Sequence, residues 1–159
     1  MSGRLSAQSI LLLAAAILVF GTACARKPQT IAPGAEKCEH CRMMIHDMRF
    51  HAQAFNEHGK LRHFDSIECA MLYRQTAAEK LSAVYAADYL HPGSYLRLVD
   101  GEGAPAVIVH SAKIHSPMGA GLAAVRAEDA EGFRIRTTGE VLDLAALEKY
   151  LRAQSEPVR

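Results

Sequence analysis

The chain has 159 residues, of which half are hydrophobic and 22% are charged. This length accommodates one domain with its own core, and the charged fraction is too low for a wholly disordered chain. With 18 Lys and Arg against 17 Asp and Glu, the chain lacks the basic excess that a broad nucleic-acid surface needs to neutralise phosphates.

The first 23 residues are typical of an export signal. A short polar start with one charge, Arg4, precedes the apolar run Ile10–Phe20, which is too short to span a bilayer. The small residues Gly21–Ala23 then precede Cys24, the arrangement of a bacterial lipobox. We therefore predict a lipoprotein signal peptide over 1–23, a lipid on the sulfur of Cys24, a flexible tether over 24–37, and a periplasm-facing position on the cell envelope. The alternative is plain cleavage after Ala23, which leaves Cys24 as a free thiol.

Local patterns in the first half of the domain predict a β-β-α-β order. Alternating apolar residues predict strands at 49–56 and 60–64, joined by the turn Glu57–Gly59. The D-x-x-E pattern of Asp65–Glu68 is typical of a capping box, so a helix is expected from 65 to about 79 or 81. A strand is expected at 83–89.

The second half also mixes strands with helices. Strands are predicted at 95–99, 106–110, 122–125 and 140–142, and helices at 128–138 and 144–152, the last of them capped by Asp143. Strands mixed with helices after hairpins favour an α+β fold built of two related halves. We expect this domain to occupy residues 38–153, with a frayed tail at 154–159.

The densest chemical feature is the stretch Cys38–Met48, in which eleven residues hold two thiols, three thioethers and two imidazoles. Thiolate and thioether together select Cu(I) over harder ions, whereas zinc gains nothing from methionine. The C-x-x-C spacing lets Cys38 and Cys41 turn toward one ion, and Met43 and Met44 follow directly. Three other interpretations stay open: a Cys38–Cys41 disulfide, a thioredoxin-like redox pair, and half of a zinc site completed by Cys69 or a distant His.

Two further sulfur residues lie outside this stretch. Cys69 falls in the first turn of the expected helix, where the helix dipole favours a thiolate, although most such cysteines are small core hydrophobes. Met118 lies in the middle of the Pro/Gly-rich loop Ser116–Gly121. Packing rarely needs a thioether between Pro and Gly, so a ligand role is favoured there. The chain contains no P-loop, G-x-G-x-x-G, G-x-S-x-G or H-E-x-x-H motif, so we predict no enzyme site.

The order of these motifs resembles that of the NosL family, the accessory lipoproteins of nitrous oxide reductase. The matching stretches are the lipobox Cys24, C-E-H-C-R-M-M-I from Cys38, R-F-H-A-Q, F-D-S-I-E-C ending at Cys69, and S-P-M-G from Ser116. The resemblance covers roughly residues 38–151 and the signal. It implies an α+β fold with two β-β-α-β halves, similar to the organomercurial lyase fold.

The same resemblance implies a periplasmic Cu(I) chaperone that works in the maturation of nitrous oxide reductase, beside a periplasmic partner of a membrane ABC transporter. It places Cys38, Cys41 and Met43 on the family's C-x-x-C-x-M motif and Met118 on the Met of its P-M-G motif; Met44 and Cys69 are second-tier candidates. Arg42 stands where many members have Gly.

Our first hypothesis is therefore a lipid-anchored Cu(I) metallochaperone that delivers copper for the copper–sulfur centre of nitrous oxide reductase. The alternative is a thiol–disulfide oxidoreductase that uses Cys38 and Cys41 on exported clients. A third idea, carbon–mercury bond cleavage, rests on fold analogy and needs a proton donor such as Asp65 or Asp47.

Overall fold

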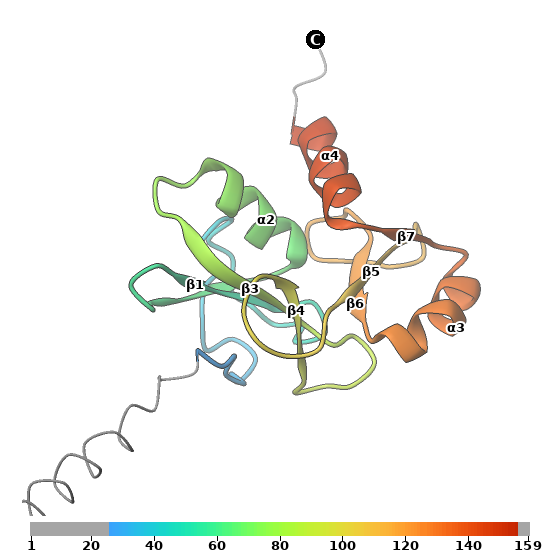
Figure 1. Ribbon diagram of the computed structural model, residues 1–159, viewed down its shortest axis with the longest axis horizontal. Coiled ribbons are helices and arrows are strands. Elements are labelled where there is room, and N and C mark those ends of the chain that lie inside the picture. Colours follow the sequence, from blue (N-terminus) through green and yellow to red (C-terminus); the bar gives the residue numbers. More distant parts are fainter. Residues whose placement is uncertain (1–25, 156–159) are drawn as a thin grey trace, which may run out of the picture.

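Two antiparallel sheets divide the chain in the computed structural model, which describes residues 26–155 (Figure 1). The first half contains β1 (Ala52–Asn56), β2 (Leu61–Phe64), α2 (Ile67–Thr76), β3 (Leu81–Ala87) and β4 (Tyr95–Val99). The second half contains β5 (Val107–His110), β6 (Leu122–Val125), α3 (Ala127–Thr137), β7 (Glu140–Leu142) and α4 (Leu144–Ser155). The predicted signal peptide and Cys24 lie outside the described residues. Within residues 26–155, no helix combines the length and apolar character needed to cross a membrane.

The two halves share one strand arrangement. The first sheet has the order β2-β1-β3-β4 and the second has the order β6-β5-β7. In each half the first strand is central, its hairpin partner lies on one side, and the strand that follows the helix lies on the other. The expected α+β fold with two β-β-α-β halves is confirmed; β4 adds a fourth strand to the first sheet and α4 follows the second.

The central strands β1 and β3 of the first sheet are buried on both faces, because each face carries a hydrophobic cluster. Ala52, Ala54 and Val84 lie in the main core cluster together with Ile67 and Met71 of α2. Alanine on the strands removes bulk, so the helix packs close to the sheet. The opposite face carries a separate cluster centred on Phe55, Ala83 and Tyr85.

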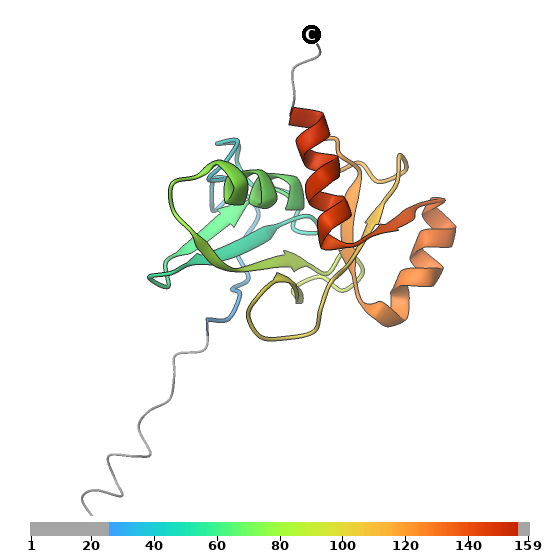
Figure 2. The ribbon, with the colours of Figure 1, turned by 45° about the horizontal axis from the view of Figure 1, so that its top comes forward.

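The two halves are joined through a shared core and through buried polar contacts. Leu147 and Leu151 of α4 belong to the same core cluster as α2, and Figure 2 shows α4 between α2 and the second sheet. Asp88, which is fully buried, accepts a hydrogen bond from Arg126 Nε at 2.7 Å. The N–H of Tyr89 donates to the carbonyl of Ala124. These contacts fix the second half relative to the first.

Several boundaries differ from those expected. The strands at 95–99, 122–125 and 140–142 have the predicted bounds, whereas β1 begins at Ala52 and β3 occupies Leu81–Ala87. Helix α2 ends at Thr76, well before the predicted 79 or 81, because Ala77 is extended. The last helix continues to Ser155, past the expected domain limit at 153, and Asp143 caps it by accepting from Ala146 N.

The capping residue of α2 was predicted wrongly. Ser66 is the N-cap, since its side chain accepts a hydrogen bond from the N–H of Cys69. Asp65, the expected cap, lies one residue earlier and is only 4% exposed. A shift of one residue changes which side chain meets the free N–H groups, and either residue type satisfies them.

The segment 26–37 packs against the first sheet, contrary to the expected tether. The Arg26 guanidinium donates to Ser82 Oγ at 3.0 Å and to the carbonyl of Glu57 at 3.1 Å. The N–H of Gln29 donates to Gln53 Oε1 at 2.9 Å, which gives this fully buried amide a partner. Burying an unpaired polar group is costly. Polar side chains of the sheet, Ser82 and Gln53, therefore hold this segment by hydrogen bonds.

We predict that Ser66→Ala lowers the free energy of unfolding by about 1 kcal/mol, the usual cost of losing an N-cap. Urea unfolding followed by circular dichroism measures the change. Thr30→Ala, at an exposed position, is the control and should change stability by less than about 0.5 kcal/mol. Equal stabilities of the wild type and Ser66→Ala would contradict the capping role.

Candidate metal centre

A tight loop holds Cys38 and Cys41 side by side. The N–H of Cys38 donates to the carbonyl of Met43 at 2.8 Å, and the N–H of Arg42 donates back to the carbonyl of Cys38 at 3.0 Å. Lys37 and Met44 form an antiparallel bridge at the base of the loop. The loop aims the N–H of Cys41 at Cys38 Sγ, 3.4 Å away.

Arg42 closes this loop in a left-handed conformation, with φ of +66°. That region is costly for residues with a Cβ and free for glycine. A glycine, which the family resemblance predicts at this position, would adopt this conformation without that cost. The Arg42 side chain points into solvent and pairs with Glu39 at 3.1 Å.

Helix α2 brings a third cysteine to the loop. Cys69 lies in its first turn and is fully buried, as is Cys38, while Cys41 is partly exposed. The three sulfurs lie within 4.8 Å of one another, and all three cysteines are free. The structure therefore joins two segments of the chain into a three-cysteine group that is suited to a soft metal ion.

Hydrogen bonds to Cys38 favour its thiolate. The Cys69 thiol donates to the Cys38 sulfur, and the N–H groups of Asp65 and Cys41 add to this, so that the pKa of Cys38 falls to about 5 although burial opposes the shift. The folded pKa lies below the ordinary value for a thiol. This ionisation therefore stabilises the fold fully above the ordinary thiol pKa of 9.0. The contribution declines as the pH falls below 9.0 and is lost at about 5.

The other two thiols keep their protons at neutral pH. The hydrogen bond that Cys69 donates to Cys38 raises its own pKa, and burial adds to the effect. Burial is also the main cause that raises the pKa of Cys41, followed by the neighbouring Cys38. A metal ion bound by all three sulfurs thus displaces two protons, so its affinity rises with pH.

The candidate methionines lie nearer to solvent. Met43, Met44 and Met118 are 47%, 37% and 39% exposed. Met43 and Met44 are part of the Cys38 loop, and Met118 lies between β5 and β6. The Met118 loop contacts α2 through a hydrogen bond from the Ser116 hydroxyl to Glu68. The sequence did not reveal this link, because its partners are 48 positions apart.

The two aspartates considered as proton donors have different surroundings. Asp65 is buried next to Cys38, and burial followed by the Cys38 charge raises the pKa of its carboxyl. Asp47 pairs with Arg49 at 2.6 Å, and this guanidinium lowers its pKa.

Histidines do not join the three-cysteine group within residues 26–155. His51, which is fully buried, is hydrogen-bonded through Nδ1 to Tyr95 at 2.7 Å and through Nε2 to His63 at 3.2 Å. Burial lowers the pKa of His51 to about 3, so the ring is neutral at physiological pH. These contacts account for His51 and His63 as parts of the fold.

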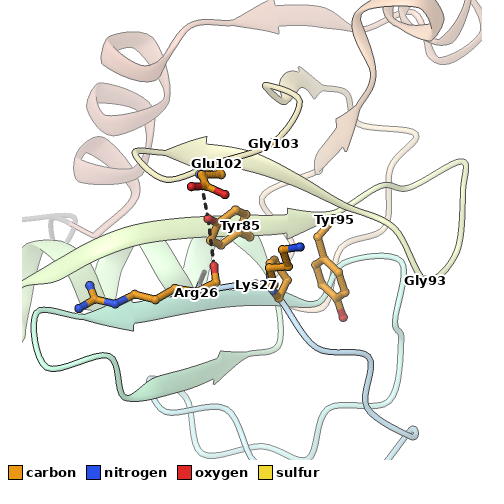
Figure 3. A pocket seen from close by; sticks show the side chains of 8 residues that line it. Arg26, Lys27, Tyr85, Gly93, Tyr95, Glu102 and Gly103 are labelled. Carbon is orange, nitrogen blue, oxygen red and sulfur yellow. Dashed lines mark hydrogen bonds between the residues drawn. The ribbon is translucent and has the colours of Figure 1, made fainter. Parts of the chain in front are cut away.

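A pocket of about 380 Å³ lies away from the cysteines (Figure 3). Tyr85, Tyr95, Arg26 and Glu102 contribute to its lining. The Tyr85 hydroxyl accepts from the N–H of Glu102 and donates to the carbonyl of Arg26. The lining contains no cysteine or methionine, so the pocket offers nothing to a soft metal ion, and we assign the candidate site to the three-cysteine group.

Replacement of Cys69 tests the origin of the low Cys38 pKa. Cys69→Ala removes the donor, so the pKa of Cys38 should rise from about 5. Cys69→Ser retains a hydroxyl donor and should raise it less. Ultraviolet absorbance of the thiolate, followed against pH in the metal-free protein, measures the difference. Identical titrations of the two variants and the wild type would contradict the hydrogen-bond explanation.

The fold and the site define a class of protein: an α+β domain of two related halves with a three-cysteine group, two of whose members are buried. The profile of the NosL family matches residues 28–151, and the chain belongs to this family. The crystal structure of the copper chaperone NosL from Shewanella denitrificans superimposes with a TM-score of 0.61 and 17% identity. The superposition covers 76% of this chain and 94% of that chain. A comparison with curated proteins gave no match.

Proposed function

We propose that this chain is a Cu(I) metallochaperone, a carrier of the metal rather than an enzyme. The observation that carries the proposal is the approach of Cys38, Cys41 and Cys69 to within 4.8 Å of one another, as free cysteines from two segments. Three thiol sulfurs match the soft donors that Cu(I) prefers, and the loop of Cys38 also carries Met43 and Met44. A structural zinc site takes four ligands, and the group supplies three.

The difference in burial between the sulfurs suits a carrier. Cys38 and Cys69 are buried and fixed by hydrogen bonds, whereas Cys41 is partly exposed and Met43 and Met118 are more exposed still. A partner's sulfur donor can approach the ion from the exposed side and replace these ligands one by one. Neutral thioethers are weaker donors than thiolates, which favours their exchange.

Membership of the NosL family supports a particular acceptor. We propose that copper goes to the copper–sulfur centre of nitrous oxide reductase, through maturation machinery that includes a periplasmic partner of a membrane ABC transporter. We also propose a signal peptide over 1–23 and a lipid on Cys24 that anchors the chain to the cell envelope. Arg26, only two positions further on, is bound to the domain, so such an anchor would hold the domain close to the membrane.

The alternative of a thiol–disulfide oxidoreductase has one observation in its favour, the low pKa of Cys38. A nucleophilic thiolate must also be accessible. Cys38 is fully buried, and the more exposed Cys41 has a raised pKa. The sulfur that ionises readily is therefore the buried one, and the accessible sulfur keeps its proton. This separation favours metal binding over thiol–disulfide exchange.

An anaerobic Cu(I) competition titration tests the proposed carrier. We expect one tightly bound Cu(I) per reduced chain, and loss of this binding in the double variant Cys38→Ser/Cys41→Ser. Turnover on a disulfide substrate should be absent in the same preparation. Cu(I) binding that is indifferent to the double substitution, or disulfide turnover that depends on Cys38, would overturn the proposal.

A second experiment tests delivery and anchoring in cells. In a denitrifying bacterium that lacks its own NosL, the chain should restore copper loading of nitrous oxide reductase. Labelling with radioactive palmitate should mark the wild type and not Cys24→Ala. Full copper loading of nitrous oxide reductase in cells without the chain would contradict the proposed acceptor. Palmitate labelling of Cys24→Ala would contradict lipid attachment at Cys24.

A further inference from the structure

Glu68 is a buried carboxylate that the metal centre itself does not use. It lies in the first turn of α2, directly before Cys69, and is only 2% exposed. Its Oε1 accepts a hydrogen bond from the Ser116 hydroxyl, and among the described residues its Oε2 has no hydrogen-bond partner. Burial of a carboxylate is costly unless it is hydrogen-bonded. The hydrogen bond from the Ser116 hydroxyl therefore offsets part of the free-energy cost of burying Glu68.

Ser116 organises the loop that carries Met118. Its hydroxyl donates to Glu68 and also accepts from the N–H of Gly121 at 3.0 Å, while its carbonyl accepts from the N–H of Gly119 at 2.9 Å. Gly121 has a φ of +66°, and a Cβ there would lie 2.5 Å from the carbonyl oxygen of Ser111. The loop therefore closes around Ser116 and leaves Met118 at its tip.

The loop is anchored in both halves of the protein. Within the second half, the hydroxyl of Tyr150 on α4 donates to the carbonyl of Ala120 at 3.0 Å. Toward the first half, the link is the hydrogen bond between Ser116 and Glu68. A cavity of about 190 Å³ lies between these anchors and is lined in part by Glu68 and Met118. Room beside the thioether means that packing alone does not fix Met118.

We propose that Glu68 is a positioning residue that holds the Met118 thioether at the three-cysteine group. Glu68 and Cys69 are consecutive residues of one helical turn, so the turn that supplies the third thiol also fixes the loop that supplies the thioether. This inference rests on the proposed function, because it requires Met118 to be a Cu(I) ligand. It gives α2 a second role, the alignment of sulfur donors from the two halves.

The test compares Cu(I) affinities of variants of the full chain, measured by anaerobic competition. Met118→Ala removes the thioether, and Glu68→Leu and Ser116→Ala each remove the hydrogen bond. Each of the three should lower the affinity by a similar factor, about 10- to 100-fold, the usual cost of losing support around a metal. Glu68→Gln keeps an oxygen that accepts from Ser116, so it should retain the wild-type affinity.

Two measurements separate positioning from a general loss of structure. Adding Glu68→Leu to Met118→Ala should cause no further loss of affinity, because both changes remove the same ligand. X-ray absorption of the copper in Glu68→Leu should lack the thioether sulfur seen in the wild type. Glu148→Leu is the matched control: Glu148 also bridges the halves, by pairing with Arg74 of α2 at 2.7 Å, yet its replacement should leave the affinity unchanged.

The outcomes distinguish this inference from the function on which it rests. If Met118→Ala binds Cu(I) as the wild type does, Met118 is not a ligand and that part of the proposed function fails. If Met118→Ala weakens binding while Glu68→Leu and Ser116→Ala do not, the positioning role is overturned. An additive loss in the double variant, or an equal loss in Glu148→Leu, overturns it as well. Ser116→Ala decides the matter alone if Glu68→Leu does not fold.

Discussion

Replacing Cys38 with serine is expected to lower the affinity for Cu(I) by more than about 100-fold, above the range for changes around a metal site. Cys38 is the sulfur to which the Cys69 thiol and the N–H groups of Asp65 and Cys41 all donate, and it is ionised above about pH 5. Serine places a weaker donor with a much higher pKa at the same point. Anaerobic competition against a colorimetric Cu(I) chelator measures the loss.

Two other cysteine variants serve as comparisons for Cys38→Ser. Cys41→Ser should lower the affinity less, because Cys41 is partly exposed and keeps its proton at neutral pH. Cys69→Ala should combine a lost ligand with a raised Cys38 pKa. A loss of less than about tenfold in Cys38→Ser would contradict the central place of this thiolate, since even indirect changes around metal sites usually cost that much.

Replacing Phe64 with alanine should lower the free energy of unfolding by about 3–5 kcal/mol, the usual cost of removing a buried aromatic ring. Phe64 ends β2 and is fully buried, and its ring centroid lies 5.2 Å from that of Tyr73 on α2. Phe64 shares a core cluster with Ile67 and Met71 of α2, so alanine leaves a cavity between strand and helix. Urea unfolding followed by circular dichroism measures the change.

The same variant should disturb the metal centre. Phe64 directly precedes Asp65, whose N–H donates to the Cys38 sulfur, so movement of this strand end should raise the Cys38 pKa. Ile135→Ala, at a side chain that is 62% exposed, is the control and should change stability by less than about 0.5 kcal/mol. A Phe64→Ala protein as stable as this control would show that the ring does not support the core as described.

Local signals in the sequence were sufficient for most of the secondary structure. The strands at 95–99, 122–125 and 140–142 have their predicted bounds, and a glycine lies within two residues before the start of each. No repeat of residues in the sequence predicts the strand arrangement that the two sheets share. It depends on pairing between distant segments, which hydrophobic period alone does not specify.

The departures come from contacts that no local pattern encodes. Arg26 and Gln29 looked like tether residues because they lack a periodic pattern, yet the sheet offers them Ser82 and Gln53 as partners. The same limit applies to the capping of α2, where two adjacent residues were both suitable and the fold selected Ser66.

The candidate site was predictable in part. The C-x-x-C-x-M stretch identified Cys38 and Cys41 because their spacing is local. Cys69 was expected to be either core or ligand, and the structure makes it both buried and a member of the sulfur group. The hydrogen bond between Glu68 and Ser116 was missed, since it joins the two halves across 48 positions.

Copper X-ray absorption on the Cu(I)-loaded protein tests most directly whether one ion is held by cysteines from two segments. We predict a shell of sulfur alone, containing the thiolates of Cys38, Cys41 and Cys69, and the loss of one thiolate sulfur in Cys69→Ala. A shell that includes an imidazole nitrogen, or a two-sulfur shell that Cys69→Ala leaves unchanged, would contradict the three-cysteine centre.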